Sequence, residues 1–357
     1  MLTSNSKIKV LITDDSLLVR AVLRELLESD SDIEVIGEAT NGKEALEQVL
    51  LLKPDIVTMD LEMPVMGGHK AIEEIMAIYA VPILVISSLD DAENAYAAIS
   101  HGALEVIGKP QLESLVAKQF VAKVKMLSKI KVIKHLRPKS AKPPQVPVVK
   151  RNTAQVMLTE QKQQVFAIAS STGGPRALEA ILKKLPADFS SPIVIAQHIS
   201  AGFEQGMADW LNHIIPMQVK IARDSELLKP GQVYISPANQ HLSISANQRV
   251  VLQSATDGDI YHPSCDILLT SIAKAYAEKA VGIICTGMGS DGAQGMEAIN
   301  TAGGMTIAQD EESSVVFGMN QVAISRHCIQ HVLSLNAIAT EMRALTSSQY
   351  KSDLSFS

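Results

Sequence analysis

The sequence predicts two α/β domains, each built around a doubly wound, mostly parallel β-sheet. Its length of 357 residues accommodates two domains of about 100–200 residues each. Short runs rich in Val and Ile alternate with segments of helical periodicity along most of the chain, a pattern typical of parallel sheets. The alternation stops near residue 130 and resumes after Gln161, so we place a linker between the two domains there.

The first domain contains five predicted strands, each followed by a helical segment. The strands are Lys9–Asp14, Glu34–Ala39, Asp55–Asp60, Pro82–Ser87 and Glu105–Gly108. Apolar residues recur at helical spacing in Leu17–Glu28, and a second helix is expected over Lys43–Leu52. In a sheet of strand order 2-1-3-4-5, the first and third of these strands are neighbours.

The segment between the domains differs from both in composition. Lys131 to Arg151 include seven Lys or Arg, four Pro and no acidic residue. Proline favours extended backbone and is excluded from the interior of regular helices. We therefore expect a solvated linker over residues 130–160, and a contact with nucleic acid or acidic lipid is the alternative. The domains are then residues 1–129 and 161–346, followed by a polar tail over 347–357.

The second domain returns to the alternation of strands and helices. Its predicted strands lie near Val165–Ala169, Pro192–Gln197, Val281–Thr286 and Met305–Ala308. Proline is favoured in the first turn of a helix, so Pro175 suits a helix that begins at about Gly174.

Composition and charge exclude several classes of protein. A formal net charge of −6 argues against a protein that mainly binds nucleic acid. No stretch approaches the roughly 18 unbroken apolar residues of a membrane span, and the N-terminus lacks the apolar core of a signal peptide. Three widely separated cysteines, Cys265, Cys285 and Cys328, fit buried small hydrophobes better than a disulfide framework or a zinc site. We expect a cytoplasmic protein that neither binds DNA nor inserts into a membrane.

Polar side chains at the strand ends of the first domain form a candidate phosphoryl site. Asp14 and Asp15 follow the first strand and Asp60 ends the third, so three carboxylates meet at one edge of the sheet. Their mutual repulsion requires a cation, and oxygen ligands in an open site suit Mg²⁺. Ser87 and Lys109, which end the fourth strand and follow the fifth, would hydrogen-bond and neutralise a phosphoryl group. Taken singly, the aspartates could be helix caps or loop residues, and the lysine a solvated surface residue.

Together with the run MDLEMPVMGG from Met59 and with Lys109-Pro110, these residues resemble the response-regulator receiver family over roughly residues 6–129. The resemblance implies a flavodoxin-like (βα)5 fold and phosphorylation of Asp60 by a histidine kinase. It also implies a magnesium site formed by Asp15, Asp60, the backbone carbonyl of Glu62 and, in a supporting role, Asp14.

The segment ASSTGGPR at residues 169–176 follows a strand and needs a different interpretation. It matches neither G-x-G-x-x-G nor the phosphate loop with its lysine. Compared with the nucleophile elbow G-x-S-x-G, it reads A-x-S-x-G and places Ser171 in the nucleophile position. The alternative is that Ser170, Ser171 or Thr172 only caps the helix that follows.

A serine nucleophile needs a base and an acid that orients it. His198 ends the strand PIVIAQH. Asp291 lies in the glycine-rich run TGMGSDG, which follows the next predicted strand along the chain. All three candidates therefore lie at strand ends of one parallel sheet, although Asp291 could also cap the helix over Gly292–Ile299. The backbone amides of Thr172 and Met288 are candidate oxyanion donors. This set predicts a serine hydrolase of acyl substrates.

The second domain closely resembles the catalytic domain of the chemotaxis protein-glutamate methylesterase (CheB) family. The matching blocks are SSTGGP from Ser170, Gln197-His198 with Phe203, SPANQHL from Ser236, HPSCD from His262, TGMGSDGAQGM from Thr286 and ESSVVFGM from Glu312. The resemblance implies hydrolysis of γ-glutamyl methyl esters on chemoreceptors with release of methanol, and deamidation of receptor glutamines. It places Ser171, His198 and Asp291 on the catalytic positions and Thr172 and Met288 on supporting ones, with no cofactor in this domain.

The chain departs from both families at a few positions. Ala169 replaces the glycine usual before the catalytic turn, and Val106 stands where receivers often carry a switch aromatic. Trp210 and Asn320 replace a common arginine and proline, and we expect them to reshape the substrate groove.

A phosphoacceptor and a hydrolase in one chain suggest that the unphosphorylated receiver covers the esterase cleft and that phosphorylation relieves the block. Two alternatives stay open at this point. One is a regulator whose second domain binds a partner without catalysis, and the other is an esterase with a substrate other than a chemoreceptor.

Overall fold

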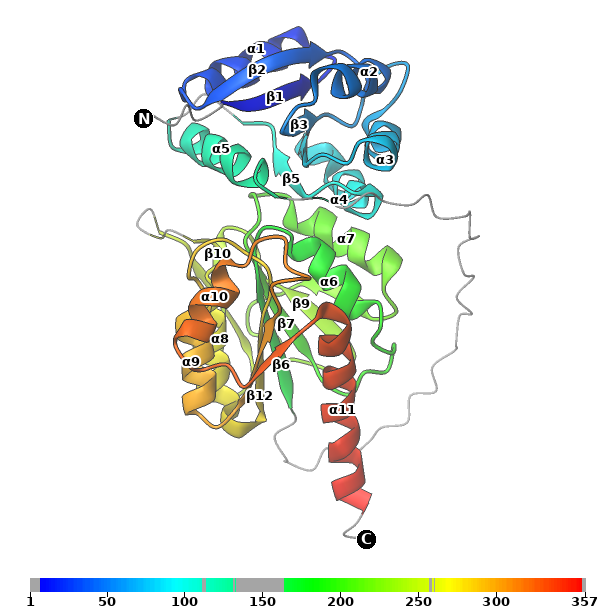
Figure 1. Ribbon diagram of the computed structural model, residues 1–357. Coiled ribbons are helices and arrows are strands. Elements are labelled where there is room, and N and C mark those ends of the chain that lie inside the picture. The colour runs from blue at the N-terminus through cyan, green and yellow to red at the C-terminus, as the bar shows by residue number, and fades with distance from the viewer. Residues whose placement is uncertain are drawn as a thin grey trace.

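The computed structural model describes residues 7–110, 114–130, 132, 164–256, 259 and 261–354. Two α/β domains, one above the other in Figure 1, contact each other directly. The predicted linker over residues 130–160 lies almost entirely outside the described residues. Among the described residues, no helix combines the length and the apolar character needed to span a bilayer.

The N-terminal domain is a five-stranded parallel sheet of order β2-β1-β3-β4-β5. Its strands are β1 (Ile8–Thr13), β2 (Ile33–Ala39), β3 (Ile56–Met59), β4 (Ile83–Ser87) and β5 (Glu105–Gly108). Its helices are α1 (Leu17–Glu28), α2 (Gly42–Leu52), α3 (Gly68–Ile78), α4 (Ala92–His101) and α5 (Ser114–Leu127), with a short 3₁₀ turn over Leu89–Asp91. The fold class and strand order predicted from the sequence are confirmed.

Local signals explain where two of these helices begin. The Ser16 hydroxyl accepts a hydrogen bond from the Val19 amide at the start of α1, and Asn41 accepts two from the first turn of α2. The central strands β3 and β4 are buried throughout, as strands covered by helices on both faces must be.

The C-terminal domain is a seven-stranded parallel sheet of order β14-β13-β12-β6-β7-β9-β8, with a separate antiparallel hairpin, β10-β11. The sheet strands are β6 (Val165–Ser170), β7 (Ile193–Gln197), β8 (Gln218–Ile221), β9 (Gln232–Ile235), β12 (Ala280–Ile284), β13 (Met305–Gln309) and β14 (His331–Leu333). The hairpin strands are β10 (Gln240–Ile244) and β11 (Val250–Ser254). The four predicted strands are present, and β8–β11 and β14 are additional to them.

Helices cover both faces of this sheet (Figure 1). On one side lie α6 (Gly174–Leu182), α7 (Glu204–Ile214) and α11 (Leu335–Leu354), and on the other α8 (Cys265–Tyr276), α9 (Ala293–Thr301) and α10 (Gly318–Ser325). The helix α11 continues to Leu354, so most of the predicted polar tail is helical. All three cysteines are free and buried, as predicted.

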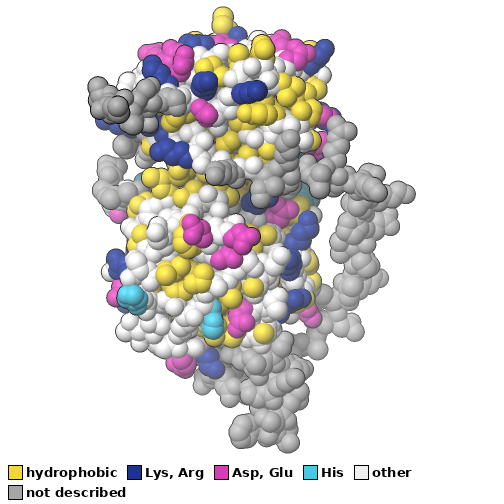
Figure 2. Space-filling model, viewed as in Figure 1, with side chains coloured by type: hydrophobic (Ala, Val, Ile, Leu, Met, Phe, Trp, Pro, Cys, Tyr) yellow, Lys and Arg dark blue, Asp and Glu magenta, His cyan; other side chains and the backbone are white. Residues whose placement is uncertain are grey.

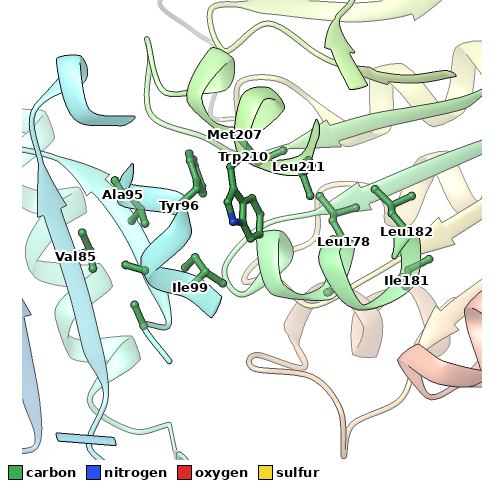
Figure 3. Close-up of a cluster of buried hydrophobic side chains, with 14 of the residues drawn as sticks. Val85, Ala95, Tyr96, Ile99, Leu178, Ile181, Leu182, Met207, Trp210 and Leu211 are labelled. Carbon is green, nitrogen blue, oxygen red and sulfur yellow. The ribbon is translucent and has the colours of Figure 1, made fainter. Parts of the chain in front are cut away.

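An apolar interface joins the domains. The helix α4 packs against α7, and the buried ring of Trp210 in α7 stacks on Tyr96 in α4, with ring centroids 5.9 Å apart (Figure 3). Trp210 therefore lies in the domain interface, and the expectation that it reshapes the substrate groove stays a prediction. A small residue is required nearby, because a Cβ on Gly206 would lie 2.6 Å from the backbone carbon of Ala92.

Polar contacts border this apolar interface. His213 pairs with Glu93 at 2.8 Å, and the Ser100 hydroxyl donates to Glu179 at 3.4 Å. On the face shown in Figure 2, acidic and basic side chains are interspersed over both domains, without a continuous basic stripe among its described residues.

Candidate active site and phosphoryl site

A sharp turn at the end of β6 presents Ser171. Gly173 adopts φ +78°, a conformation that favours glycine, and the amide of Gly174 donates to the carbonyl of Ser171 at 2.8 Å. Gly173 is also the N-cap of α6, which has no side-chain cap. The alternative in which one of the three hydroxyls caps this helix is therefore wrong, and Ser171 is available for another role.

Gln197, at the end of β7, braces the same turn. Its side-chain amide donates to the carbonyls of Ser171 and His198, each at 2.8 Å, and its oxygen accepts from the Ser170 hydroxyl at 2.7 Å. A Cβ on Gly174 would lie 1.9 Å from this oxygen. Gly174 thus allows the close approach that fixes the turn.

The structure brings Ser171, His198 and Asp291 together in one chain of hydrogen bonds. The Nδ1 atom of His198 lies 3.1 Å from the Ser171 Oγ, and its Nε2 lies 2.7 Å from Oδ2 of Asp291. An ionised carboxylate can only accept, so Nε2 carries the proton. The lone pair of Nδ1 is then directed at the serine hydroxyl, which is the arrangement of a general base and its nucleophile.

The Asp291 carboxylate is held by the N-terminus of α8 rather than by its own helix. It accepts hydrogen bonds from the amides of Cys265 and Asp266, at 2.7 and 2.9 Å, and from the Ser264 hydroxyl at 3.1 Å. Burial alone would raise its pKa, but hydrogen bonds from His198 and these amides outweigh burial and lower the pKa of Asp291. The cap of α9 is Gly292, so the predicted alternative role of Asp291 as that cap is wrong.

The two predicted oxyanion donors lie on either side of the nucleophile turn. Thr172 is buried and Met288 exposed, and among the described residues neither backbone amide donates to another group. The Thr286 hydroxyl donates to the carbonyl of Thr172 at 2.9 Å, and the Ser171 amide donates to the Thr286 carbonyl at 3.0 Å. The loop carrying Met288 is therefore tied to the loop carrying Ser171.

Two residues of the triad, together with Cys265, have the spacing of a metal site. Donor atoms of His198, Cys265 and Asp291 lie within 4.8 Å of one another. Burial raises the pKa of the Cys265 thiol well above its usual value, so the thiol is protonated at neutral pH. Since a metal ligand must be the thiolate, the chemistry of this donor set favours the hydrogen-bonded triad.

Several residues of the site were not predicted as functional. Ser264 was identified only within the block HPSCD, although a serine before a helical run is a typical N-cap signal. Tyr261 stacks on the His198 ring, with centroids 5.0 Å apart and planes 9° apart. No local pattern marks this residue, because its partner is distant in sequence.

The strand ends of the N-terminal domain form the second site. Ligand atoms of Asp14, Asp15 and Asp60 lie within 4.8 Å of one another. The Lys109 ammonium lies 3.1 Å from Asp14 and 3.5 Å from Asp60. Burial, followed by repulsion from Asp14, raises the pKa of Asp60 to about 6 against the opposing effect of Lys109. Asp14 and Asp60 are buried and Asp15 is exposed, and this clustering of carboxylates matches the expected need for a cation.

The remaining predicted residues of this site lie as the topology requires. Ser87 is buried at the end of β4, and its carbonyl accepts from the Lys109 amide at 3.1 Å. Arg20, which was not predicted, donates to the carbonyls of Asp14 and Asp15 and thereby fixes the acidic loop. The role of the Glu62 carbonyl stays a prediction.

Asn320 is fully buried behind the loop that contacts the N-terminal domain. Its side-chain amide donates to the Gln309 carbonyl at 2.7 Å and to the Ser314 hydroxyl at 3.3 Å. It therefore anchors residues 310–317 from inside the domain. Val315 of this loop packs against the apolar core of the N-terminal domain, and a Cβ on Gly173 would lie 2.6 Å from the Val315 Cβ.

A groove of about 1620 Å³ runs between the domains beside this loop. Its walls come from α1, α5 and the loop 311–317, and Met288 lies on its border. The side chain of His198 is 15% exposed, so the triad is largely covered in this arrangement of the domains.

Two family models match the chain. The model described as CheB methylesterase matches residues 166–342, and the model described as response regulator receiver domain matches residues 10–119.

Curated relatives match almost the whole chain. A protein-glutamate methylesterase/protein-glutamine glutaminase of Paramagnetospirillum magneticum is 47% identical over 345 residues, covering 96% of this chain and 97% of its own length. A protein of the same name from Carboxydothermus hydrogenoformans is 39% identical over 346 residues, covering 95% of this chain and 99% of its own length. The crystal structure of the Thermotoga maritima CheB methylesterase catalytic domain has a TM-score of 0.50 and 37% identity, covering 52% of this chain and 100% of its own.

Proposed function

Because this chain belongs to the CheB methylesterase family and carries a receiver domain before its catalytic domain, we propose that it is a phosphorylation-regulated protein-glutamate methylesterase. It hydrolyses γ-glutamyl methyl esters of chemoreceptors to glutamate and methanol, and it deamidates receptor glutamines. The observation that carries this proposal is the hydrogen-bonded chain from Ser171 through His198 to Asp291.

The reaction follows from the protonation states of the triad. As the Ser171 oxygen attacks the ester carbonyl, Nδ1 of His198 takes its proton, and Asp291 stabilises the resulting imidazolium through Nε2–H. The imidazolium then protonates the leaving methoxide, which departs as methanol and leaves an acyl-enzyme. A water molecule, deprotonated by His198, hydrolyses the acyl-enzyme and regenerates Ser171. With a glutamine side chain the leaving group is ammonia.

The negative oxygen of the tetrahedral intermediate needs donors that are not already committed. The amides of Thr172 and Met288 fit this role, because neither donates to another described group. The hydrogen bond from the Thr286 hydroxyl to the Thr172 carbonyl, and that from the Ser171 amide to the Thr286 carbonyl, hold the Thr172 side of this pair in place. The loss of one such donor typically lowers the rate about 10²–10³-fold.

In the receiver domain, a carboxylate oxygen of Asp60 accepts the phosphoryl group of a phosphohistidine. The oxygen donors and the mutual repulsion of the acidic cluster fit Mg²⁺, held by Asp15, Asp60 and the Glu62 carbonyl with Asp14 in support. When bound, the ion neutralises charge on the transferring phosphoryl group. Lys109 contributes a second positive charge, and Ser87 donates a hydrogen bond to a phosphoryl oxygen.

We further propose that docking of the receiver restrains the esterase. The apolar interface around Trp210 holds the domains together, and Val315 lies between the receiver core and the turn that carries Ser171. A bulky substrate helix must reach Ser171 past this contact. Phosphorylation at Asp60 shifts the equilibrium toward an undocked state and raises the rate.

The partners follow from this assignment. A histidine kinase of a chemotaxis system supplies the phosphoryl group, and methyl-accepting chemoreceptors supply the esters. The enzyme acts in the cytoplasm, does not bind DNA and does not insert into the membrane.

The test is methanol release from methyl-labelled chemoreceptor membranes, with and without a small phosphodonor and Mg²⁺. The native protein is compared with Ser171→Ala, which we expect to lose about 10⁴-fold or more of the rate. Phosphodonor-stimulated release that depends on Ser171 supports both halves of the proposal. A partner-binding module without catalysis would release no methanol, and its affinity for receptor would survive the substitution.

A further inference from the structure

Tyr261 contacts one face of the His198 imidazole ring, which the hydrogen bonds of the triad leave without a contact. The two hydrogen bonds of His198 run in the plane of its ring, to Ser171 and Asp291. They do not hold the ring against movement perpendicular to that plane. The Tyr261 ring is stacked on it, with ring planes 9° from parallel and centroids 5.0 Å apart, and so supports one face of the imidazole.

The turn that carries Tyr261 is itself fixed by hydrogen bonds. The Ser264 amide donates to Nδ1 of His241 at 3.1 Å, so Nε2–H of this buried histidine donates to Asp259, also at 3.1 Å. Asp259 accepts two further bonds, from the amide and hydroxyl of Thr256. Because the Ser264 hydroxyl donates to Asp291, the same turn positions both Tyr261 and the acid of the triad.

The far end of the tyrosine reaches the loop of the second oxyanion donor. Gly289, which follows Met288, has φ +94°, and a Cβ there would lie 2.5 Å from the Tyr261 hydroxyl oxygen. The ring therefore spans from the base to this loop. The other titratable groups against the His198 ring are Asp291 and the Cys265 thiol, whose sulfur lies 3.7 Å from Nε2.

We propose that Tyr261 is a positioning residue for catalysis, which holds the His198 ring in register with Ser171 and stabilises its protonated form through the aromatic face. This inference rests on the proposed hydrolase function. The imidazole is neutral before the serine is deprotonated and cationic in the transition state. A cation above an aromatic face is attracted more strongly than a neutral ring, so the contact favours the transition state over the ground state.

The expected effect is on turnover rather than on substrate binding. Cation–π contacts of this kind correspond to roughly twofold to thirtyfold in rate. Tyr261→Leu should lower kcat by a factor in this range and leave KM within about twofold. Tyr261→Phe keeps the aromatic face, so it should retain the wild-type rate within about twofold.

The experiment uses the full chain activated by phosphodonor and Mg²⁺, with Tyr79→Leu in the receiver as a matched control. The pH dependence of kcat/KM is measured for all four proteins. Loss of the aromatic face disfavours the imidazolium, so the acidic limb of the Tyr261→Leu profile should move to lower pH by about 0.3–1.5 units, which corresponds to the same twofold to thirtyfold range. The Tyr261→Phe and Tyr79→Leu profiles should coincide with the wild type.

A second readout does not depend on turnover. The imidazole of His198 is titrated by NMR in the Ser171→Ala background, with Tyr, Phe or Leu at position 261, and only the last should titrate at lower pH. The proposal is overturned if Tyr261→Leu keeps the wild-type rate, or if its rate falls while the kcat/KM profile and the NMR titration both stay at the wild-type pH. It is also overturned if Tyr261→Phe does not restore the wild-type rate and titration. A wild-type enzyme without Ser171-dependent turnover would instead refute the proposed function, and the titration would still test the contact.

Discussion

Gly206 offers a way to separate the domains without changing any residue of either site. It lies in the first turn of α7, on the face that packs against the start of α4. An alanine Cβ at this position would lie 2.6 Å from both the backbone carbon and the Cβ of Ala92, whereas ordinary contact begins at 3.4 Å. Because the obstructing atoms include backbone, the clash is relieved by moving the two domains apart.

The size of the effect follows from this overlap. Overpacking in a well-packed interface costs about 1–3 kcal/mol. Within α7 itself alanine is favoured over glycine by about 1 kcal/mol, so the catalytic domain is not weakened. The cost therefore falls on docking and shifts the docked-to-undocked ratio roughly 5–150-fold. If docking restrains the esterase, basal activity rises by the same factor until the undocked form predominates.

The assay is the initial rate of methanol release from methyl-labelled receptor, without and with phosphodonor. Gly206→Ala should raise the basal rate toward the phosphorylated wild-type rate and reduce the stimulation by phosphodonor. The effect should persist when Asp60 is also replaced by asparagine, because separation no longer requires phosphorylation. Gln205→Ala, on the exposed side of the same helix, serves as the control and should change neither rate. An unaltered basal rate in a folded Gly206→Ala protein, with stimulation intact, would refute autoinhibition through this interface.

Three further predictions concern single residues. Trp210 is the only tryptophan and lies buried against Tyr96. Separation of the domains by phosphorylation or by Gly206→Ala should therefore expose it and shift its fluorescence emission to longer wavelength. An emission wavelength that stays constant while activity rises would contradict domain separation. The pKa of Asp60 is raised to about 6, so without Mg²⁺ the unfolding free energy of the native receiver should fall as pH rises from about 4 through 6. Asp60→Asn should remove this fall, which is on the order of 2 kcal/mol, as measured by calorimetry with a chelator present. Asp291→Asn turns an amide NH₂ toward backbone donors that need an acceptor. We therefore expect kcat to fall about 10⁴-fold and the unfolding free energy to fall by about 1–3 kcal/mol. A fall in kcat of less than tenfold would speak against the triad.

The elements that the sequence predicted best are those with strong local patterns. The helix Leu17–Glu28 has the same bounds in the prediction and in the structure, because its apolar spacing and its N-cap Ser16 agree. Two of the strands that were missed, β8 and β14, are short and partly exposed. In β8 only Val219 is buried, and β14 at the opposite edge of the sheet has no fully buried residue, so neither shows a buried apolar run.

The candidate site was predictable where chemistry resides at strand ends. Parallel topology brings Ser171, His198 and Asp291 to one edge, and the same rule brings together the acids of the receiver. The supporting contacts were not predictable, since the amides that hold Asp291 belong to α8 and Tyr261 meets His198 only in the folded chain. The location of Trp210 was missed for the same reason, because its partner belongs to the other domain.

The close fit of the two domains limits how such proteins can be recombined. At Gly202 and Gly206 the catalytic domain presents bare backbone to Leu89 and Ala92 of the receiver. A receiver with a bulkier residue at position 92 would keep its phosphoacceptor chemistry and yet fail to seat on this catalytic domain. A chimaera made by exchanging receivers would therefore be constitutively active rather than inactive. It would be regulated only if the α7 residues that contact the receiver were exchanged together with the receiver. In such a lineage the residues of α4 and α7 would have to change together, while the chemistry at either strand edge could stay the same.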